Sequence, residues 1–137
     1  MRVVALDVGT RRIGLAAGES ENGLAFGRGY LLRGTLTDDL TGIRRLILEE
    51  GAQVLCFGLP RKLNGEVGTV WSEIEPLLQA LSGEIKIELV DERFTTRLAQ
   101  SRLRSTSRKV RREKGNHDEG AAIAILETYL ESIRARD

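Results

Sequence analysis

The sequence is poor in aromatic residues, contains a single cysteine and has no long apolar run. One cysteine cannot form an internal disulfide, and it excludes a zinc site built from several thiolates. No apolar stretch approaches the roughly 20 residues that span a bilayer, and the N-terminus lacks the features of a signal peptide. We therefore expect a cytoplasmic protein without a membrane partner. With aromatics at 4%, base stacking in the manner of single-strand binders is not expected.

The residues that are present fit one folded domain. The chain has 137 residues, of which 41% are hydrophobic and 30% charged, so it is long and apolar enough for one core. This composition excludes intrinsic disorder and fibrous structure. Cys56 lies in an apolar run and is expected to be a reduced core residue. We predict a single domain over residues 1–137.

Charge is distributed unevenly along the chain. The net charge is +1, yet residues 93–114 hold nine basic residues against one acid, so this segment carries +8 and the remainder −7. Such asymmetry favours a surface that binds a polyanion, with a solvated basic helix or disordered run as the alternative. The basic residues are Arg93, Arg97, Arg102, Arg104, Arg108, Lys109, Arg111, Arg112 and Lys114.

The apolar pattern predicts the element order βββαβαβα. Short apolar runs predict strands over residues 3–8, 13–17, 24–32, 53–58 and 85–90, and helical periodicity predicts helices over 36–50, about 69–81 and beyond 118. Thr37 or Asp38 is the expected cap of the first helix and Gly51 its end. Pro76 requires that the second helix either kinks or starts later, with Ser72 as its cap.

These elements predict an α/β fold. Three strands joined by tight connections form an antiparallel meander, and the two strands separated by helices are expected to be parallel. The result is a mixed five-stranded sheet flanked by helices. A basic helix capped by Thr95 or Thr96 and a flexible loop over residues 105–115 are expected before the last helix.

Several carboxylates fall where a core or a sheet edge is expected. Asp7 shares a strand face with Val3 and Ala5, and Asp118 precedes the last helix, on the inward stripe of its apolar residues. Asp91 and Glu92 end the fifth predicted strand at its carboxyl edge, where α/β sheets usually bind ligands. Converging carboxylates must protonate or recruit a cation, and oxygen-only ligands select Mg²⁺ or Mn²⁺. Two such ions acting on a phosphodiester would support hydrolysis.

Each of these residues also has a purely structural interpretation. Asp118 fits a helix N-cap, Asp7 fits an ion pair with Arg11 or Arg12, and Asp91 and Glu92 fit surface ion pairs. His117 is either a general acid, metal ligand or phosphate contact, or a local hydrogen-bonding residue. The coincidence of three acidic positions favours a functional site.

Four motifs in order resemble the bacterial YqgF (RuvX) family over nearly the whole chain. They are residues 5–16 (ALDVGTRRIGLA), residues 58–60 (GLP) followed by Asn64 and Gly65, residues 91–96 (DERFTT), and Asp118 before residues 121–126 (AAIAIL). The resemblance implies a ribonuclease H-like fold related to Holliday junction resolvases. It also implies a nuclease that matures the 5′ end of pre-16S ribosomal RNA.

The resemblance also implies roles for individual residues. Asp7, Glu92 and Asp118 match the acidic metal ligands, and Gly9, Thr10 and Arg11 would shape the adjoining loop. It implies phosphate contacts for Arg93, Thr95 and Thr96. Together with the basic grip that the uneven charge predicts, the expected nucleic-acid contacts are Thr10, Arg11, Arg93, Thr95, Thr96, Arg97, Arg104, Arg108, Lys109, Arg111, Arg112 and Lys114. Asp91 and His117 are auxiliary candidates. Strand parity puts Asp91 and Glu92 on opposite faces, so the choice of Glu92 comes from the family pattern.

One departure from the family pattern bears on activity. Classical resolvases place a fourth acid one turn along the last helix, whereas Ala121 occupies that position here and the adjacent Glu119 is expected to point elsewhere. The leading hypothesis is a metal-dependent endonuclease acting on structured RNA or branched DNA, including pre-ribosomal particles, as a monomer or homodimer. The alternatives are a noncatalytic nucleic-acid-binding or ribosome-assembly factor and, less consistent with the chain length, an actin-like sugar kinase.

Overall fold

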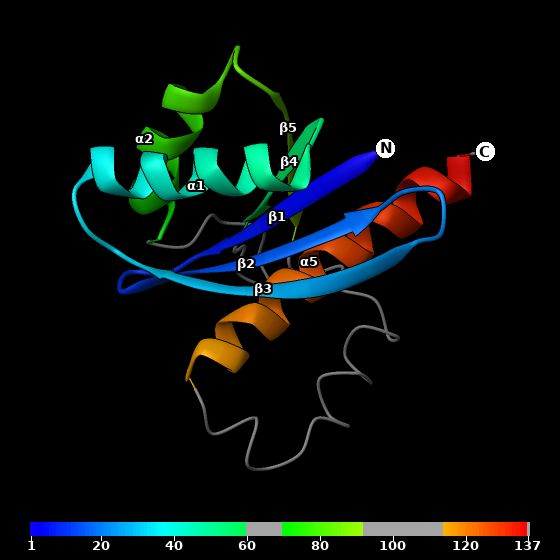
Figure 1. Ribbon diagram of the computed structural model, residues 1–137, viewed down its shortest axis with the longest axis horizontal. Coiled ribbons are helices and arrows are strands. Elements are labelled where there is room, and N and C mark those ends of the chain that lie inside the picture. Colours follow the sequence, from blue (N-terminus) through cyan, green and yellow to red (C-terminus); the bar gives the residue numbers. More distant parts are fainter. Residues whose placement is uncertain (60–69, 92–113, 137) are drawn as a thin grey trace.

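The computed structural model describes residues 1–59, 70–91 and 114–136 (Figure 1). For residues 114–118 and 136 it describes the backbone only. Five strands form one mixed sheet in the order β3-β2-β1-β4-β5. β1, β2 and β3 are antiparallel neighbours, whereas β1, β4 and β5 run parallel. The elements are β1 (Arg2–Val8), β2 (Arg12–Glu19), β3 (Leu24–Leu32), α1 (Leu36–Glu50), β4 (Val54–Leu59), α2 (Trp71–Leu81), β5 (Lys86–Asp91) and α5 (Lys114–Arg136). The predicted element order and sheet are confirmed.

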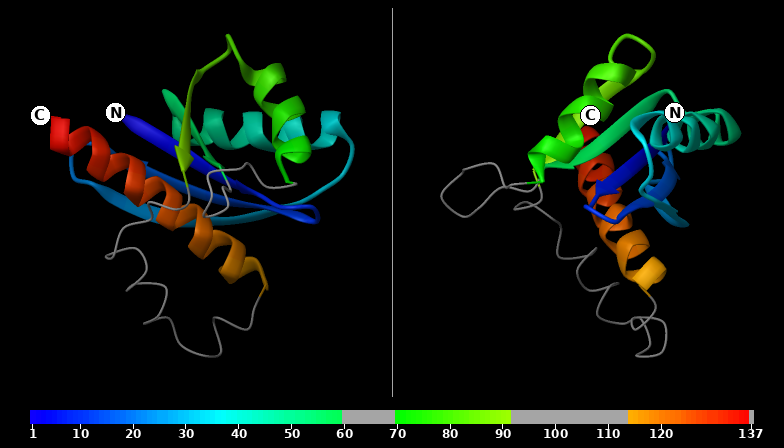
Figure 2. Two further views of the ribbon diagram at one scale, coloured as in Figure 1. Left: turned by 180° about the vertical axis from the view of Figure 1, so that it is seen from behind. Right: turned by 90° about the vertical axis from the view of Figure 1, so that its left-hand side faces the viewer.

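Helices cover both faces of the sheet (Figure 2). On the α1/α2 face, Leu6 and Phe57 of the central strands pack with Ile43 and Leu77 of the two helices. On the α5 face, smaller side chains predominate, and α5 lies across β2, β3 and β1. Cys56 is buried, as predicted, and lies on this face. Its burial and, to a smaller extent, the negative charge of the nearby Glu88 raise the pKa of its thiol.

Three helix starts differ from the expectations. Thr35, rather than Thr37 or Asp38, caps α1, because its side chain accepts the Asp38 N–H while the Asp38 carboxylate accepts the Thr35 N–H. Gly51 ends α1 in the left-handed conformation, with φ at 62°, as expected. In α2, Ser72 lies inside the helix rather than capping it, and Pro76 is accommodated within the helix.

The start of α5 also corrects the sequence expectation. Asp118 lies within the helix, four residues after its first residue Lys114, so it is not the N-cap. Apolar periodicity marks only the buried part of a helix, and the polar residues 114–118 carry no such signal. The expected basic helix and most of the 105–115 loop lie outside the described residues. Among the described helices, none is long and apolar enough to cross a membrane.

Candidate active site

Asp7 is a half-buried carboxylate near the carboxyl end of the central strand β1. Val3 and Ala5, which share its strand face, are fully buried in the cluster under α5. Asp7 therefore lies on the α5 face, opposite Gly14 of β2. A carboxylate at such a position is costly unless it is paired or binds a cation, which makes it a natural ligand position.

The parallel strands β1, β4 and β5 end at the same edge of the sheet, and Asp91 is the last residue of β5. Val90 packs in the cluster under α5, so strand alternation places Asp91 on the α1/α2 face. Asp91 thus shares the edge with Asp7 but not the face.

The other predicted ligands are described less completely. Glu92 lies outside the described residues. The backbone of Asp118 lies in α5, four residues before Ala122 and seven before Ile125, both of which are buried against the sheet. The side chains of Asp118, His117 and Lys114 are not described, and the contact candidates between Arg93 and Arg112 also lie outside the described residues. Among the side chains that the structure does describe, no group of three or more His, Cys, Asp or Glu is placed to hold a metal.

The turn that follows Asp7 is held by a polar clamp that the sequence did not reveal. The N–H of Gly9 donates to the Arg12 carbonyl at 2.8 Å, and Nη1 of Arg33 donates to the Gly9 carbonyl at 2.7 Å. Arg33 Nε also donates to the Asp39 carboxylate at 2.8 Å, whose side chain is 1% exposed. The clamp fixes the turn while leaving the side chains of Thr10 and Arg11 exposed, as contact with phosphate requires. Arg33 and Asp39 lie far from any motif, and no sequence signal links them to this turn.

An aromatic residue that no sequence motif singled out also lies in the row of Asp7. Gly14 pairs with Asp7 on one side and with Tyr30 of β3 on the other, so all three residues are on the α5 face. The guanidinium of Arg12 lies 5.1 Å from the centre of the Tyr30 ring, whose residue is 41% exposed. This edge therefore presents an arginine–tyrosine pair beside the carboxylate.

Small residues on β2 and β3 bring α5 close to the sheet. A Cβ at Gly18 would lie 2.4 Å from the Leu24 carbonyl and 3.1 Å from Leu126 of α5, so only glycine fits. At Gly27 the added atom would lie 1.8 Å from Oε1 of Glu119. Glu119 therefore points toward β3.

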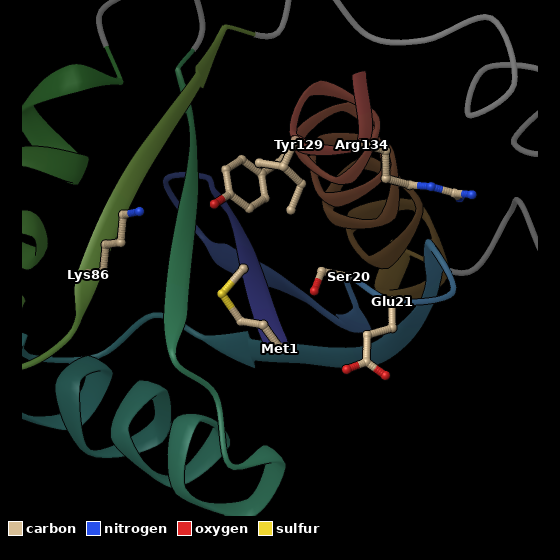
Figure 3. A pocket seen from close by; sticks show the side chains of 7 residues that line it. Met1, Ser20, Glu21, Lys86, Tyr129 and Arg134 are labelled. Atoms are coloured by element: carbon tan, nitrogen blue, oxygen red, sulfur yellow. The ribbon is translucent and has the colours of Figure 1, made fainter. Parts of the chain in front are cut away.

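A cavity of about 550 Å³ lies at the opposite edge of the sheet, where β1 and β5 begin (Figure 3). Its lining consists of Met1, Ser20, Glu21, Lys86, Tyr129, Ile133 and Arg134. Tyr129 and Arg134 both project from α5 but in opposite directions (Figure 3). Among the described residues of this lining Glu21 is the one carboxylate, so they offer no cluster of acids for a metal.

Comparison with known proteins decides the family. The profile of RuvX, described as Holliday junction resolvase, matches residues 1–132. The chain belongs to the RuvX family. It is 47% identical over 131 residues to a Thermus thermophilus protein named "Putative pre-16S rRNA nuclease", covering 95% of this chain and 97% of that one. A Gloeobacter violaceus protein of the same name is 37% identical over 141 residues, covering 99% and 89%.

Solved structures show the same fold. Thermus thermophilus RuvC in complex with a Holliday junction superposes with a TM-score of 0.63 at 12% identity, covering 98% of this chain and 96% of RuvC. The fowlpox virus resolvase in complex with junction DNA gives 0.61 at 10% identity, covering 97% and 99%. The predicted ribonuclease H-like fold is confirmed, and membership of the RuvX family makes this chain a nuclease.

Proposed function

We propose that this RuvX protein is a divalent-metal-dependent endonuclease that hydrolyses phosphodiester bonds in structured ribosomal RNA precursors in the cytoplasm. The observation that carries the proposal is the position of Asp7, a half-buried carboxylate at the carboxyl edge of the central strand, on the face covered by α5. Asp118 belongs to that same helix. These placements support a site between β1 and the first turns of α5.

The donor set fits Mg²⁺ or Mn²⁺. Asp7, Glu92 and Asp118 would hold the metal, and carboxylate oxygens are the ligands that these hard cations prefer. Strand alternation disfavours Asp91, because Val90 lies on the α5 face and Asp91 therefore lies on the other face. The family pattern matches Glu92 to this ligand position. When bound, such ions activate a water and stabilise the leaving oxygen of the phosphodiester.

The chain itself orients and grips the substrate. β1 and the Arg33 clamp fix Asp7 and the following turn, so the exposed Thr10 and Arg11 are held where a phosphate next to the carboxylate would pass. We assign further backbone contacts to the basic segment, through Arg93, Thr95, Thr96, Arg97, Arg104, Arg108, Lys109, Arg111, Arg112 and Lys114. Phosphate contacts position a nucleic acid without reading its sequence, so structure in the RNA would select the cleavage position.

The names of the similar proteins favour structured RNA over branched DNA as the substrate. The Thermus thermophilus protein that is 47% identical over nearly its full length is named for pre-16S rRNA. The structural neighbours seen with junction DNA are only 10–12% identical and support the fold alone.

A cleavage panel tests this proposal. Wild type, Asp7→Asn and Asp91→Asn are each given pre-16S rRNA, single-stranded RNA and a four-way DNA junction, with Mg²⁺, with Mn²⁺ and with chelator. We expect metal-dependent cleavage of the precursor RNA by wild type, and a loss of more than about 100-fold in Asp7→Asn with RNA binding retained. Asp91→Asn is the matched control on the other face, and it should retain cleavage. Cleavage by Asp7→Asn at the wild-type rate would overturn the mechanism, and cleavage of the junction alone would overturn the substrate.

A further inference from the structure

Glu119 makes a contact that joins the start of α5 to the edge strand of the sheet. The side chain is half-buried, and its Oε2 accepts a hydrogen bond from the backbone N–H of Gly29 at 2.8 Å. Glu119 is the first residue of α5 whose side chain is described, and it directly follows Asp118. The contact therefore lies beside a residue assigned to the metal.

β3 is shaped to receive this carboxylate. Its register with β2 shifts between Gly14 and Ala16. Gly14 pairs with Tyr30 and Ala16 pairs with Gly27, so β3 has one residue more than β2 between these two pairs. Gly29 has φ at 77°, a conformation that other residues rarely adopt, so this is a β-bulge formed by glycine. Gly29 has no partner in the register of β3 with β2, and its N–H donates to Glu119.

The position of the Glu119 carboxylate also requires a glycine at residue 27. A Cβ at Gly27 would overlap the Glu119 side chain, since it would lie 1.8 Å from Oε1 and 2.1 Å from Cδ. The residue between the two glycines, Arg28, donates from Nε to the Glu50 carboxylate of α1 at 2.5 Å. The bulge is thus tied to α1 through Arg28 and to α5 through Glu119.

We propose that Glu119 is a positioning residue that sets the distance between Asp118 on α5 and Asp7 on β1. This inference rests on the proposed metal-dependent nuclease. The ends of helices fray, and the turn that carries Asp118 is close to the start of α5, so it needs a tertiary contact to hold a ligand at a fixed distance. Glu119 supplies that contact through the sheet and does not touch substrate or metal.

A direct role for Glu119 as a fourth metal ligand is the competing interpretation, because Ala121 stands where related resolvases have their additional acid. The two interpretations make opposite predictions for conservative variants. Glu119→Gln keeps an oxygen that accepts the Gly29 N–H but removes the charge. Glu119→Asp keeps the charge but shortens the side chain by one methylene, which takes the carboxylate away from Gly29.

The test compares Glu119→Ala, Glu119→Gln and Glu119→Asp with Glu131→Ala, a matched control at an exposed glutamate of the same helix. With pre-16S rRNA we expect Glu119→Ala and Glu119→Asp to lose about ten-fold or more in kcat with KM for RNA unchanged. We expect their half-saturating Mn²⁺ concentration to rise about ten-fold, the size typical of groups that orient metal ligands. Glu119→Gln and Glu131→Ala should stay close to wild type. Gly27→Ala should match Glu119→Ala, because its new Cβ displaces the carboxylate.

Two measurements without substrate make the test independent of cleavage. Hydrogen exchange of the Gly29 amide should quicken in Glu119→Ala and Glu119→Asp but not in Glu119→Gln, and Mn²⁺ affinity measured by calorimetry should follow the same order. A Glu119→Gln variant as impaired as Glu119→Ala would overturn the positioning role in favour of ligation. Wild-type kcat and Mn²⁺ affinity in Glu119→Asp would also overturn it. If instead Asp7→Asn still cleaves, the proposed function fails, and the Gly29 exchange and Mn²⁺ affinities still decide whether Glu119 positions a metal ligand.

Discussion

The two faces of the sheet are built from different side chains. On the α1/α2 face, large residues such as Leu6, Phe57 and Ile43 are fully buried between the strands and the two helices. On the α5 face, the strands present Ala5, Ala16 and glycines to the long helix α5, and Asp7 lies at the end of this surface. Hydrophobic stabilisation scales with the apolar area buried, so each large side chain of the first face contributes more than an alanine of the second. The small side chains of the second face let α5, the helix that carries Asp118, lie close to the sheet.

The largest expected effect on stability is on the α1/α2 face. Phe57→Ala removes a fully buried ring and should lower the free energy of unfolding by about 3–5 kcal/mol. Because Phe57 faces away from Asp7, kcat of the folded protein should stay within about two-fold of wild type. Urea unfolding and cleavage assays below the transition measure both quantities.

Leu48→Ala provides the control for that experiment, since Leu48 is 82% exposed and its loss should change stability little. A folded Phe57→Ala protein with kcat reduced more than about ten-fold would show that the two faces are not separable in this way.

A substitution on the α5 face is expected to change the stability less than Phe57→Ala but to lower the activity as well. In Gly18→Ala the new Cβ would lie 2.4 Å from a backbone carbonyl and 3.1 Å from Leu126, so either β3 or α5 must shift. We expect a loss of about 1–3 kcal/mol in unfolding free energy. We also expect a fall in kcat, because α5 carries Asp118.

The matched control is Gly42→Ala in α1 on the other face. There the new Cβ would meet only the end of the Leu31 side chain, at 2.7 Å, which can rotate away, and alanine favours the helix. Its stability should therefore lie within about 1 kcal/mol of wild type, with kcat unchanged. Equal kcat in both glycine variants would contradict a special role for close packing of α5.

Much of the fold follows from the sequence because it rests on local patterns. Short apolar runs and helical periodicity predict the strands and α1, and the predicted range of α1 is the observed one. Starts of helices are predicted less well. The Thr35 capping box competes with Thr37 and Asp38 in sequence, and the polar first residues of α5 carry no periodicity.

The candidate site is predicted only in part, for a physical reason. The face of Asp7 follows from strand alternation, which a single sequence contains. The bonds from Arg33 to Gly9 and from Gly29 to Glu119 join residues brought together by the tertiary fold, since the two pairs are 24 and 90 positions apart in the chain. Tyr30 reaches the row of Asp7 because the bulge at Gly29 changes the register of β3. The spacing of residues along the sequence does not predict these contacts.

The central claim is that a divalent cation binds between β1 and the start of α5, and paramagnetic broadening by Mn²⁺ tests it most directly. In spectra of isotope-labelled protein with substoichiometric Mn²⁺, the amides of Val8, Gly9 and Asp118 should lose intensity first. Those of Lys86 and Tyr129, at the opposite edge of the sheet, should lose it last, and Asp7→Asn should abolish the selective effect. Selective broadening around Lys86 and Tyr129, or the same pattern in Asp7→Asn, would contradict the account.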